Sequence, residues 1–141
     1  MGADCAVRNK TLPWIEATRL GLAEMEALPA DWDGEGSPQT DPALVASARA
    51  LLARLEGEAL AAVPTPYVIP VQGGGSFQIE WDALPKHLEL EFSARGTVLC
   101  LVEEEREIDV FELASDNSDA IGYLLYWLMN KGRPDFVEVE I

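Results

Sequence analysis

The spacing of hydrophobic residues changes once along this chain, and that change constrains the fold more than any other feature. Before Pro64 and Pro66 these residues recur at about every 3.6 positions, as on one face of a helix. Beyond the two prolines they alternate with polar residues, the pattern of a strand with one buried face. The sequence therefore predicts an α+β fold, with helices first and a sheet second, in a single domain covering residues 1–141.

Two helices are predicted before the change of spacing. The first starts near Thr11 and ends before Pro29. The second starts at Asp41, whose carboxylate can cap a helix, and ends near Gly57. Residues 1–10 are expected to form a flexible N-terminus, and they show no signal-peptide pattern.

The later part of the chain predicts an antiparallel meander of about five strands, with the two helices packed on one face. The strands are expected at Tyr67–Val71, Phe77–Asp82, His87–Phe92, Thr97–Glu103 and Arg106–Leu113. A hydrophobic C-terminal helix, capped by Ser118 and running to Asn130, should follow. Phe136–Ile141 suggests a final edge strand.

The hairpin turns predict which residues share a face of the sheet. A turn at Ala83–Lys86 pairs Trp81 with Leu88, Ile79 with Leu90 and Phe77 with Phe92 on the buried face. It also puts Glu80 opposite Glu89 on the reverse face. A two-residue turn at Arg95-Gly96 then adds residues to both faces. Leu99, Leu101, Ile108 and Val110 should join the buried face, and Val98, Cys100, Val102 and Phe111 the face with the carboxylates.

The charge of the chain limits its partners. Its 25 acidic and 10 basic residues give a net charge of -15, which repels phosphate backbones and anionic membranes. We therefore expect no direct nucleic-acid or membrane binding, and either a basic protein partner or self-association. A second interpretation is that the acidity only keeps the protein soluble. Cys5 and Cys100 form no disulfide framework, which favours a reducing, cytoplasmic location.

The loop after the first predicted helix has the sequence Trp32-Asp33-Gly34-Glu35-Gly36-Ser37-Pro38. Trp32 is expected to plug the core, Asp33 to accept backbone N–H groups, and the two glycines to supply positive φ. With Gly73-Gly74-Gly75 and Ile79-Glu80-Trp81, this loop resembles a family of small uncharacterised bacterial proteins. Small acidic proteins of this kind often look like antitoxins or immunity proteins, so the resemblance favours a partner-binding role.

Few residues suggest catalysis. His87 is the only histidine, and the predicted register pairs it with Asp82 as a surface ion pair. The cysteines lack zinc-site spacing, and the run Glu103-Glu104-Glu105 looks like a charged turn. We therefore predict no metal and no cofactor.

The leading interpretation is a non-catalytic acidic interaction module, such as an antitoxin, immunity or inhibitory protein that neutralises a basic partner. The predicted partner-binding residues are Glu80, Glu89, Glu91, Phe111, Tyr123 and Trp127. The alternative is a small enzyme or ligand-binding domain with a site between the helices and the sheet, near His87.

Overall fold

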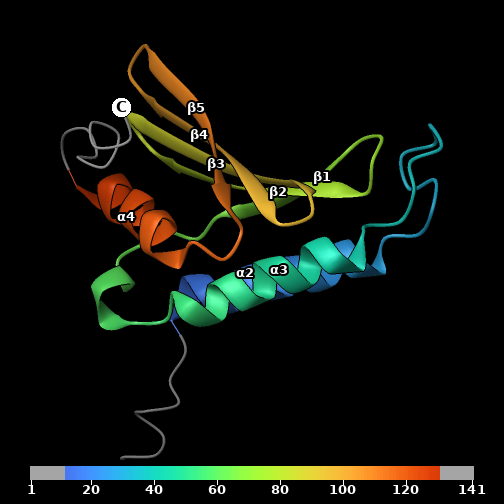
Figure 1. Cartoon of the computed structure of the whole chain (residues 1–141), viewed down its shortest axis with the longest axis horizontal. Coiled ribbons are helices and arrows are strands. Elements are labelled where there is room, and N and C mark those ends of the chain that lie inside the picture. Colours follow the sequence, from blue (N-terminus) through green and yellow to red (C-terminus); the bar gives the residue numbers. More distant parts are fainter. Residues whose placement is uncertain (1–11, 131–141) are drawn as a thin grey trace, which may run out of the picture.

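The computed structural model describes residues 12–130, and these residues form an α+β fold (Figure 1). The helices are α2 (Pro13–Ala27), α3 (Pro42–Arg54), the short 3-10 helix η1 (Glu58–Leu60) and α4 (Ser118–Met129). The strands are β1 (Tyr67–Val71), β2 (Ser76–Ala83), β3 (Lys86–Ala94), β4 (Thr97–Glu104) and β5 (Glu107–Ala114). The predicted N-terminal segment and the edge strand at Phe136–Ile141 lie outside the described residues.

The sheet is a five-stranded antiparallel meander in the order β1-β2-β3-β4-β5, as the alternating pattern predicted. The helices lie on one side of it (Figure 1). Helix α2 packs along β1, while α3 and α4 both contact β3. Gly21 permits the close approach of α2 to β1, because a Cβ at this position would lie 2.6 Å from Val68 Cγ2. None of the described helices has the length and apolar character needed to cross a membrane.

Side chains cap two of the helices. Asp41 accepts a hydrogen bond from the backbone N–H of Ala43 at 2.9 Å, which confirms the predicted cap of α3. For α4 the prediction was wrong by one residue. The cap is Asn117 rather than Ser118, because the Asn117 side chain accepts from Ala120 N at 3.1 Å. Asn is as good an N-cap residue as Ser, so the sequence alone did not distinguish them.

The pairing of β2 with β3 follows the predicted register. Phe77 lies opposite Phe92, and their rings stack with centroids 5.1 Å apart. Trp81, opposite Leu88, packs edge-on against Trp14 of α2 at 6.0 Å. These side chains belong to one buried cluster between the sheet and the helices, so this hairpin anchors the core.

The predicted register of β3 with β4 was wrong. The turn at Arg95-Gly96 is present, with Ala94 opposite Thr97, but an irregularity between Glu91 and Ala94 shifts the pairing by one residue. A one-residue shift turns every later side chain to the other face. The residues on the buried face are therefore Val98, Cys100 and Val102, each at most 3% exposed. Leu99, Leu101, Ile108 and Val110 lie on the opposite face.

The loop between α2 and α3 is held by Asp33. Its carboxylate accepts hydrogen bonds from Ser37 Oγ at 2.6 Å, from the backbone N–H groups of Glu35 and Ser37, and from Gln72 Nε2 at 2.9 Å. These donors, the Ser37 hydroxyl first, lower the pKa of Asp33 to about 2. Because Ser37 Oγ also accepts from Gly73 N at 3.1 Å, Asp33 and Ser37 join the loop to the β1–β2 turn.

The glycines of this loop follow the prediction, whereas Trp32 does not. Gly34 and Gly36 adopt the predicted positive φ of 75° and 84°. The expectation that Trp32 plugs the core was wrong, since its side chain is only half-buried and lies outside the buried cluster. The tryptophan that fills the core beside the helices is Trp14, which is 1% exposed and donates from Nε1 to Leu60 O at 2.9 Å.

Candidate functional site

The side of the sheet turned away from the helices, here called the outward face, has an acidic centre. The register arranges its side chains in rows across the strands. One row contains Tyr67, Glu80, Glu89, Leu101 and Val110, and the next contains Ile69, Gln78, Glu91, Leu99 and Glu112. A third row, near the β2–β3 turn, contains Asp82, His87, Glu103 and Ile108. Across the strands, all within the described residues, no Lys or Arg occupies an outward position.

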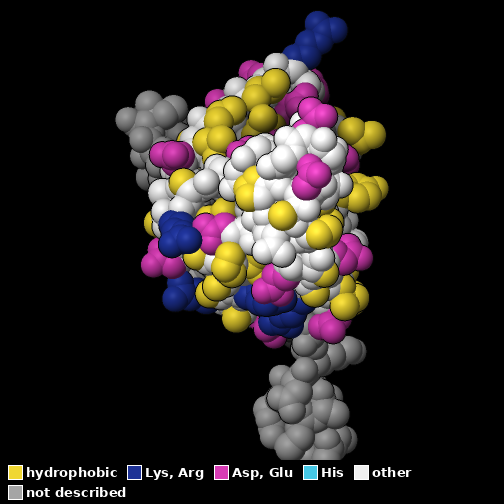
Figure 2. Space-filling model, turned by 90° about the vertical axis from the view of Figure 1, so that its right-hand side faces the viewer, with side chains coloured by type: hydrophobic (Ala, Val, Ile, Leu, Met, Phe, Trp, Pro, Cys, Tyr) yellow, Lys and Arg dark blue, Asp and Glu magenta, His cyan; other side chains and the backbone are white. Residues whose placement is uncertain are grey.

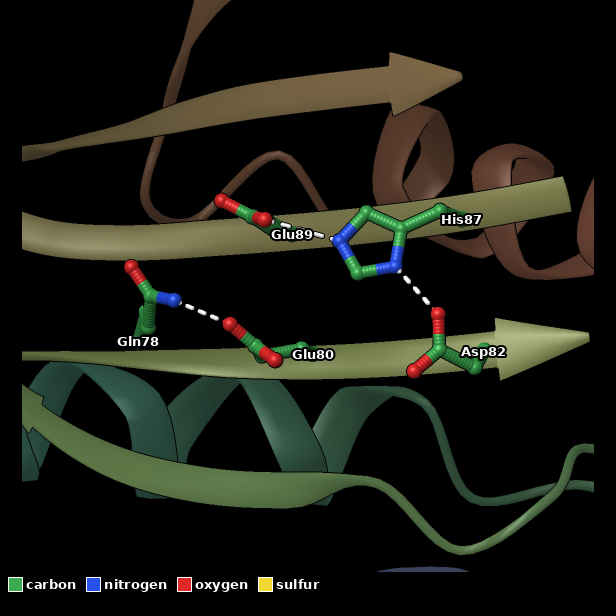
Figure 3. Close-up of polar contacts among 5 residues, drawn as sticks. All are labelled: Gln78, Glu80, Asp82, His87 and Glu89. Carbon is green, nitrogen blue, oxygen red and sulfur yellow. Dashed lines mark hydrogen bonds and ion pairs between the residues drawn. The ribbon is translucent and has the colours of Figure 1, made fainter. Parts of the chain in front are cut away.

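His87 connects two of these carboxylates. Its Nδ1 lies 2.6 Å from Asp82 Oδ1, and its Nε2 lies 2.7 Å from Glu89 Oε2 (Figure 3). The contact with Asp82 was predicted, whereas the contact with Glu89 was missed. Glu89 is two positions along the same strand, where side chains share a face, so this period could have identified it.

The His87 geometry favours the charged imidazole. A neutral ring has one N–H, whereas the imidazolium has two and can donate to both carboxylates at once. Burial of the ring, whose side chain is 19% exposed, disfavours the charge. The hydrogen bonds with Glu89 and Asp82 and their negative charges outweigh that burial, so the pKa of His87 is raised above its ordinary value. A cation is therefore stabilised at this point of the outward face.

Glu80 and Glu89 are directly opposite each other on β2 and β3, as predicted. Like charges in this arrangement destabilise a sheet. Each has a hydrogen-bond donor of its own, since Gln78 Nε2 donates to Glu80 and His87 contacts Glu89 (Figure 3). The pair still lies at the centre of a surface rich in carboxylates, where a further positive charge would be favourable.

Apolar side chains flank the acidic centre. On β5, Ile108 is 55% exposed and Val110 is 57% exposed. On β1, Tyr67 is 63% exposed and Ile69 is 37% exposed. Figure 2 shows the molecule from the right-hand side of Figure 1. Hydrophobic side chains gather at the top of this view, where Figure 1 places the β4–β5 hairpin, and acidic side chains lie beside them. The outward face therefore combines an acidic centre with apolar edges.

The structure brings together only part of the predicted partner-binding set. Glu80, Glu89 and Glu91 share the outward face. Phe111 lies opposite Cys100, so it points to the helical side and is half-buried against the core. Tyr123 and Trp127 are on α4, on that same side, and Trp127 is only 4% exposed. The register shift explains the misplacement of Phe111, and the buried side of α4 explains Trp127.

The only histidine of the chain and the buried Cys100 lie on opposite faces of the sheet. Burial raises the pKa of the Cys100 thiol to about 12, and this residue lies on the face opposite His87. Within residues 12–130, no three His, Cys, Asp or Glu side chains are grouped as metal ligands would be.

Comparisons with protein-family models, with curated proteins and with solved structures found no significant match for this chain.

Proposed function

We propose that this protein is a non-catalytic interaction module that binds a basic partner protein through the outward face of its sheet. The observation that carries the proposal is the acidic centre around Glu80 and Glu89, which has apolar edges and no Lys or Arg at any outward strand position within the described residues. An antitoxin, immunity or inhibitory protein that neutralises a basic protein would use such a surface.

Electrostatics favours a basic partner over other proteins. A chain with a net charge of -15 attracts cationic proteins at long range and increases their rate of association. At contact, a cationic side chain placed between Glu80 and Glu89 would replace a repulsion with two attractions. Negative charge thus favours a basic partner twice, first by increasing the rate of association and then through the contacts made in the complex.

The apolar edges supply the area that excludes water. Interfaces take much of their binding energy from a few well-packed side chains that lose contact with solvent. Leu101 and Val110 lie in the same row as Glu80 and Glu89, so one strand or helix of a partner could cover both kinds of residue. A partner that presents basic side chains beside apolar ones on its contacting face fits this row, in which Leu101 and Val110 follow the adjacent carboxylates.

A second copy of the chain fits this face less well. A two-fold symmetric contact places the same surface patch on both sides of the interface. For the outward face, that would bring the carboxylates of the two copies together, and no Lys or Arg at an outward position of the described strands would compensate them. We therefore favour a basic protein of different sequence.

The proposal can be tested with a short synthetic peptide that repeats Lys-Lys-Val-Val, so that each face of the extended peptide carries both residue types. Binding of this peptide is measured by fluorescence anisotropy. We expect the double variant Glu80→Gln/Glu89→Gln to bind it at least about fivefold more weakly than the wild type, with the difference shrinking as NaCl rises from about 50 to about 300 mM. The matched control is Glu24→Gln/Glu35→Gln, which removes the same charge from exposed residues on α2 and the α2–α3 loop. It should lose less than about twofold.

Two outcomes would refute the proposal. Equal losses in both double variants would mean that only net charge matters. A salt-resistant dimer of the wild type that dissociates in Glu80→Gln/Glu89→Gln would assign the face to a second copy.

The double variant itself should fold as well as the wild type or slightly better, because it removes a like-charge pair.

A further inference from the structure

A hollow of about 790 Å³ lies on the other side of the sheet, between the end of α4 and the β2–β3 turn. Its size is that of a site for a small molecule. Most of its lining is apolar, and Leu84 on its rim is 89% exposed. Its apolar lining also includes Pro85, Leu128 and Met129. His87 is not part of it, because Lys86 and His87 point to opposite faces of β3.

The rim of the hollow is held in place by its neighbours. The backbone N–H of Glu105, in the β4–β5 turn, donates to Pro85 O at 3.2 Å. Lys86 and Glu104 lie directly opposite each other just inside these turns. The two hairpins thus present one basic and one acidic side chain to the same hollow.

The ammonium group of Lys86 already has partners. Its Nζ donates to Trp127 O at 2.6 Å and lies 5.3 Å from the centroid of the Trp127 ring. The residue is 4% exposed, and this burial lowers the pKa of Lys86 even though the charge of Glu104 acts in the opposite direction. The positive charge of Lys86 therefore stabilises the carboxyl end of α4, which has no basic residue in its last turn.

One carboxylate oxygen of Glu104 lacks a hydrogen-bond donor in the described part of the chain. Its Oε1 is buried and has no hydrogen-bond partner among residues 12–130. A buried acceptor of this kind is uncommon in folded proteins and is unfavourable, more so when it carries charge. Because Glu104 lines the hollow, a ligand there can supply the missing donor once the carboxylate turns Oε1 toward it.

We propose that this hollow binds a small primary amine with an apolar body. The ammonium group of the ligand donates to Glu104 Oε1, and the apolar body packs against Leu84, Leu128 and Met129. The net charge of -15 and the carboxyl end of α4 both favour a cation here. A carboxylate ligand would meet the charge of Glu104 and would have to displace Trp127 O from Lys86. This site is independent of the outward face and of the function proposed for it.

The test is a titration of the full-length protein with n-hexylamine, followed by NMR chemical shifts. We expect saturable shifts at the residues lining the hollow, with a Kd on the order of 1 mM for a ligand of this size. Hexan-1-ol and hexanoate, which have the same carbon chain, should bind at least about fivefold more weakly. Tighter binding of hexanoate, or no saturable shift with n-hexylamine, would overturn the proposal.

Two variants measure separately how much the Glu104 carboxylate and the apolar wall contribute to binding. A third variant controls for the loss of charge. Glu104→Gln and Leu84→Ala should each weaken n-hexylamine binding, the first by about fivefold or more. Leu84 is so exposed that its replacement leaves folding intact, and it keeps the test valid if Glu104→Gln is unstable. Glu103→Gln removes a neighbouring charge from the outward face and should change the Kd by less than about twofold. Equal weakening by Glu103→Gln and Glu104→Gln would show attraction to net charge alone and overturn the site.

Discussion

The two faces of the sheet satisfy their side chains in different ways. On the helical side, Phe77, Trp81 and Phe92 are at most 1% exposed and pack against one another or against α2. On the outward face, polar contacts such as that of His87 with Asp82 connect groups that are still accessible to solvent. The first face therefore contributes to stability through burial, and the second is available for charge-dependent contacts. This contrast teaches that a single sheet can separate the residues that stabilise the fold from charged residues that stay accessible to solvent.

The strongest test of this contrast compares one substitution on each face. Phe92→Ala should lower the free energy of unfolding by about 3–5 kcal/mol, because it removes a fully buried ring stacked on Phe77. Val110→Ala on the outward face should change it by less than about 0.5 kcal/mol. Urea unfolding followed by tryptophan fluorescence measures both. Similar losses for the two variants would mean that the outward face also contributes to the core.

Neighbouring residues of β4 offer a sharper test of the register. Burial raises the pKa of Cys100 to about 12, which lowers its thiolate fraction about a thousandfold relative to an ordinary thiol. In the native protein at about pH 8, Cys100 should therefore resist iodoacetamide, whereas a cysteine introduced by Leu101→Cys should react readily. Peptide mapping by mass spectrometry resolves the two positions. Fast labelling of Cys100 before unfolding would place it on the outward face.

The smallest expected effect concerns His87. Because its pKa in the folded protein is raised, its contribution to stability is fully present below the ordinary value of 6.5 and is lost as the pH rises through the folded-state pKa. His87→Gln should thus cost less than about 1 kcal/mol near pH 5, and the difference from the wild type should shrink by about pH 9. Asp82, Glu89 and Glu103 are the charged groups facing this ring. A difference that grows with pH would contradict the ion pairs of His87 with Asp82 and Glu89.

The sequence predicted those parts of the fold that depend on local pattern. The change of hydrophobic spacing identified the helices and strands, and the β2–β3 hairpin predicted the opposition of Glu80 and Glu89. The irregularity after Glu91 could not be predicted, because neither Phe92 nor Ser93 is a glycine, the residue that marks one common type of bulge. One shifted residue was enough to misplace the apolar side chains of β4 and β5.

The candidate sites were predicted less completely. The acidic centre was found because its residues alternate along two paired strands. The contact of Lys86 with Trp127 was not found, since 41 residues separate the two and no local pattern relates them. Trp32 and Trp14 show the same limit: each occurs beside a helix terminus, and only tertiary packing determines which one fills the core.

The order of the strands also has a consequence for the speed of folding. Each strand pairs with its neighbour in sequence, and the turns that connect β2 to β5 each contain two residues. Closing such short loops costs little chain entropy, and folds rich in local pairings cross their folding barrier quickly. The docking of α2 on β1 closes a much longer loop, so we expect it to follow formation of the hairpins. The meander then acts as an early template on which the helices assemble.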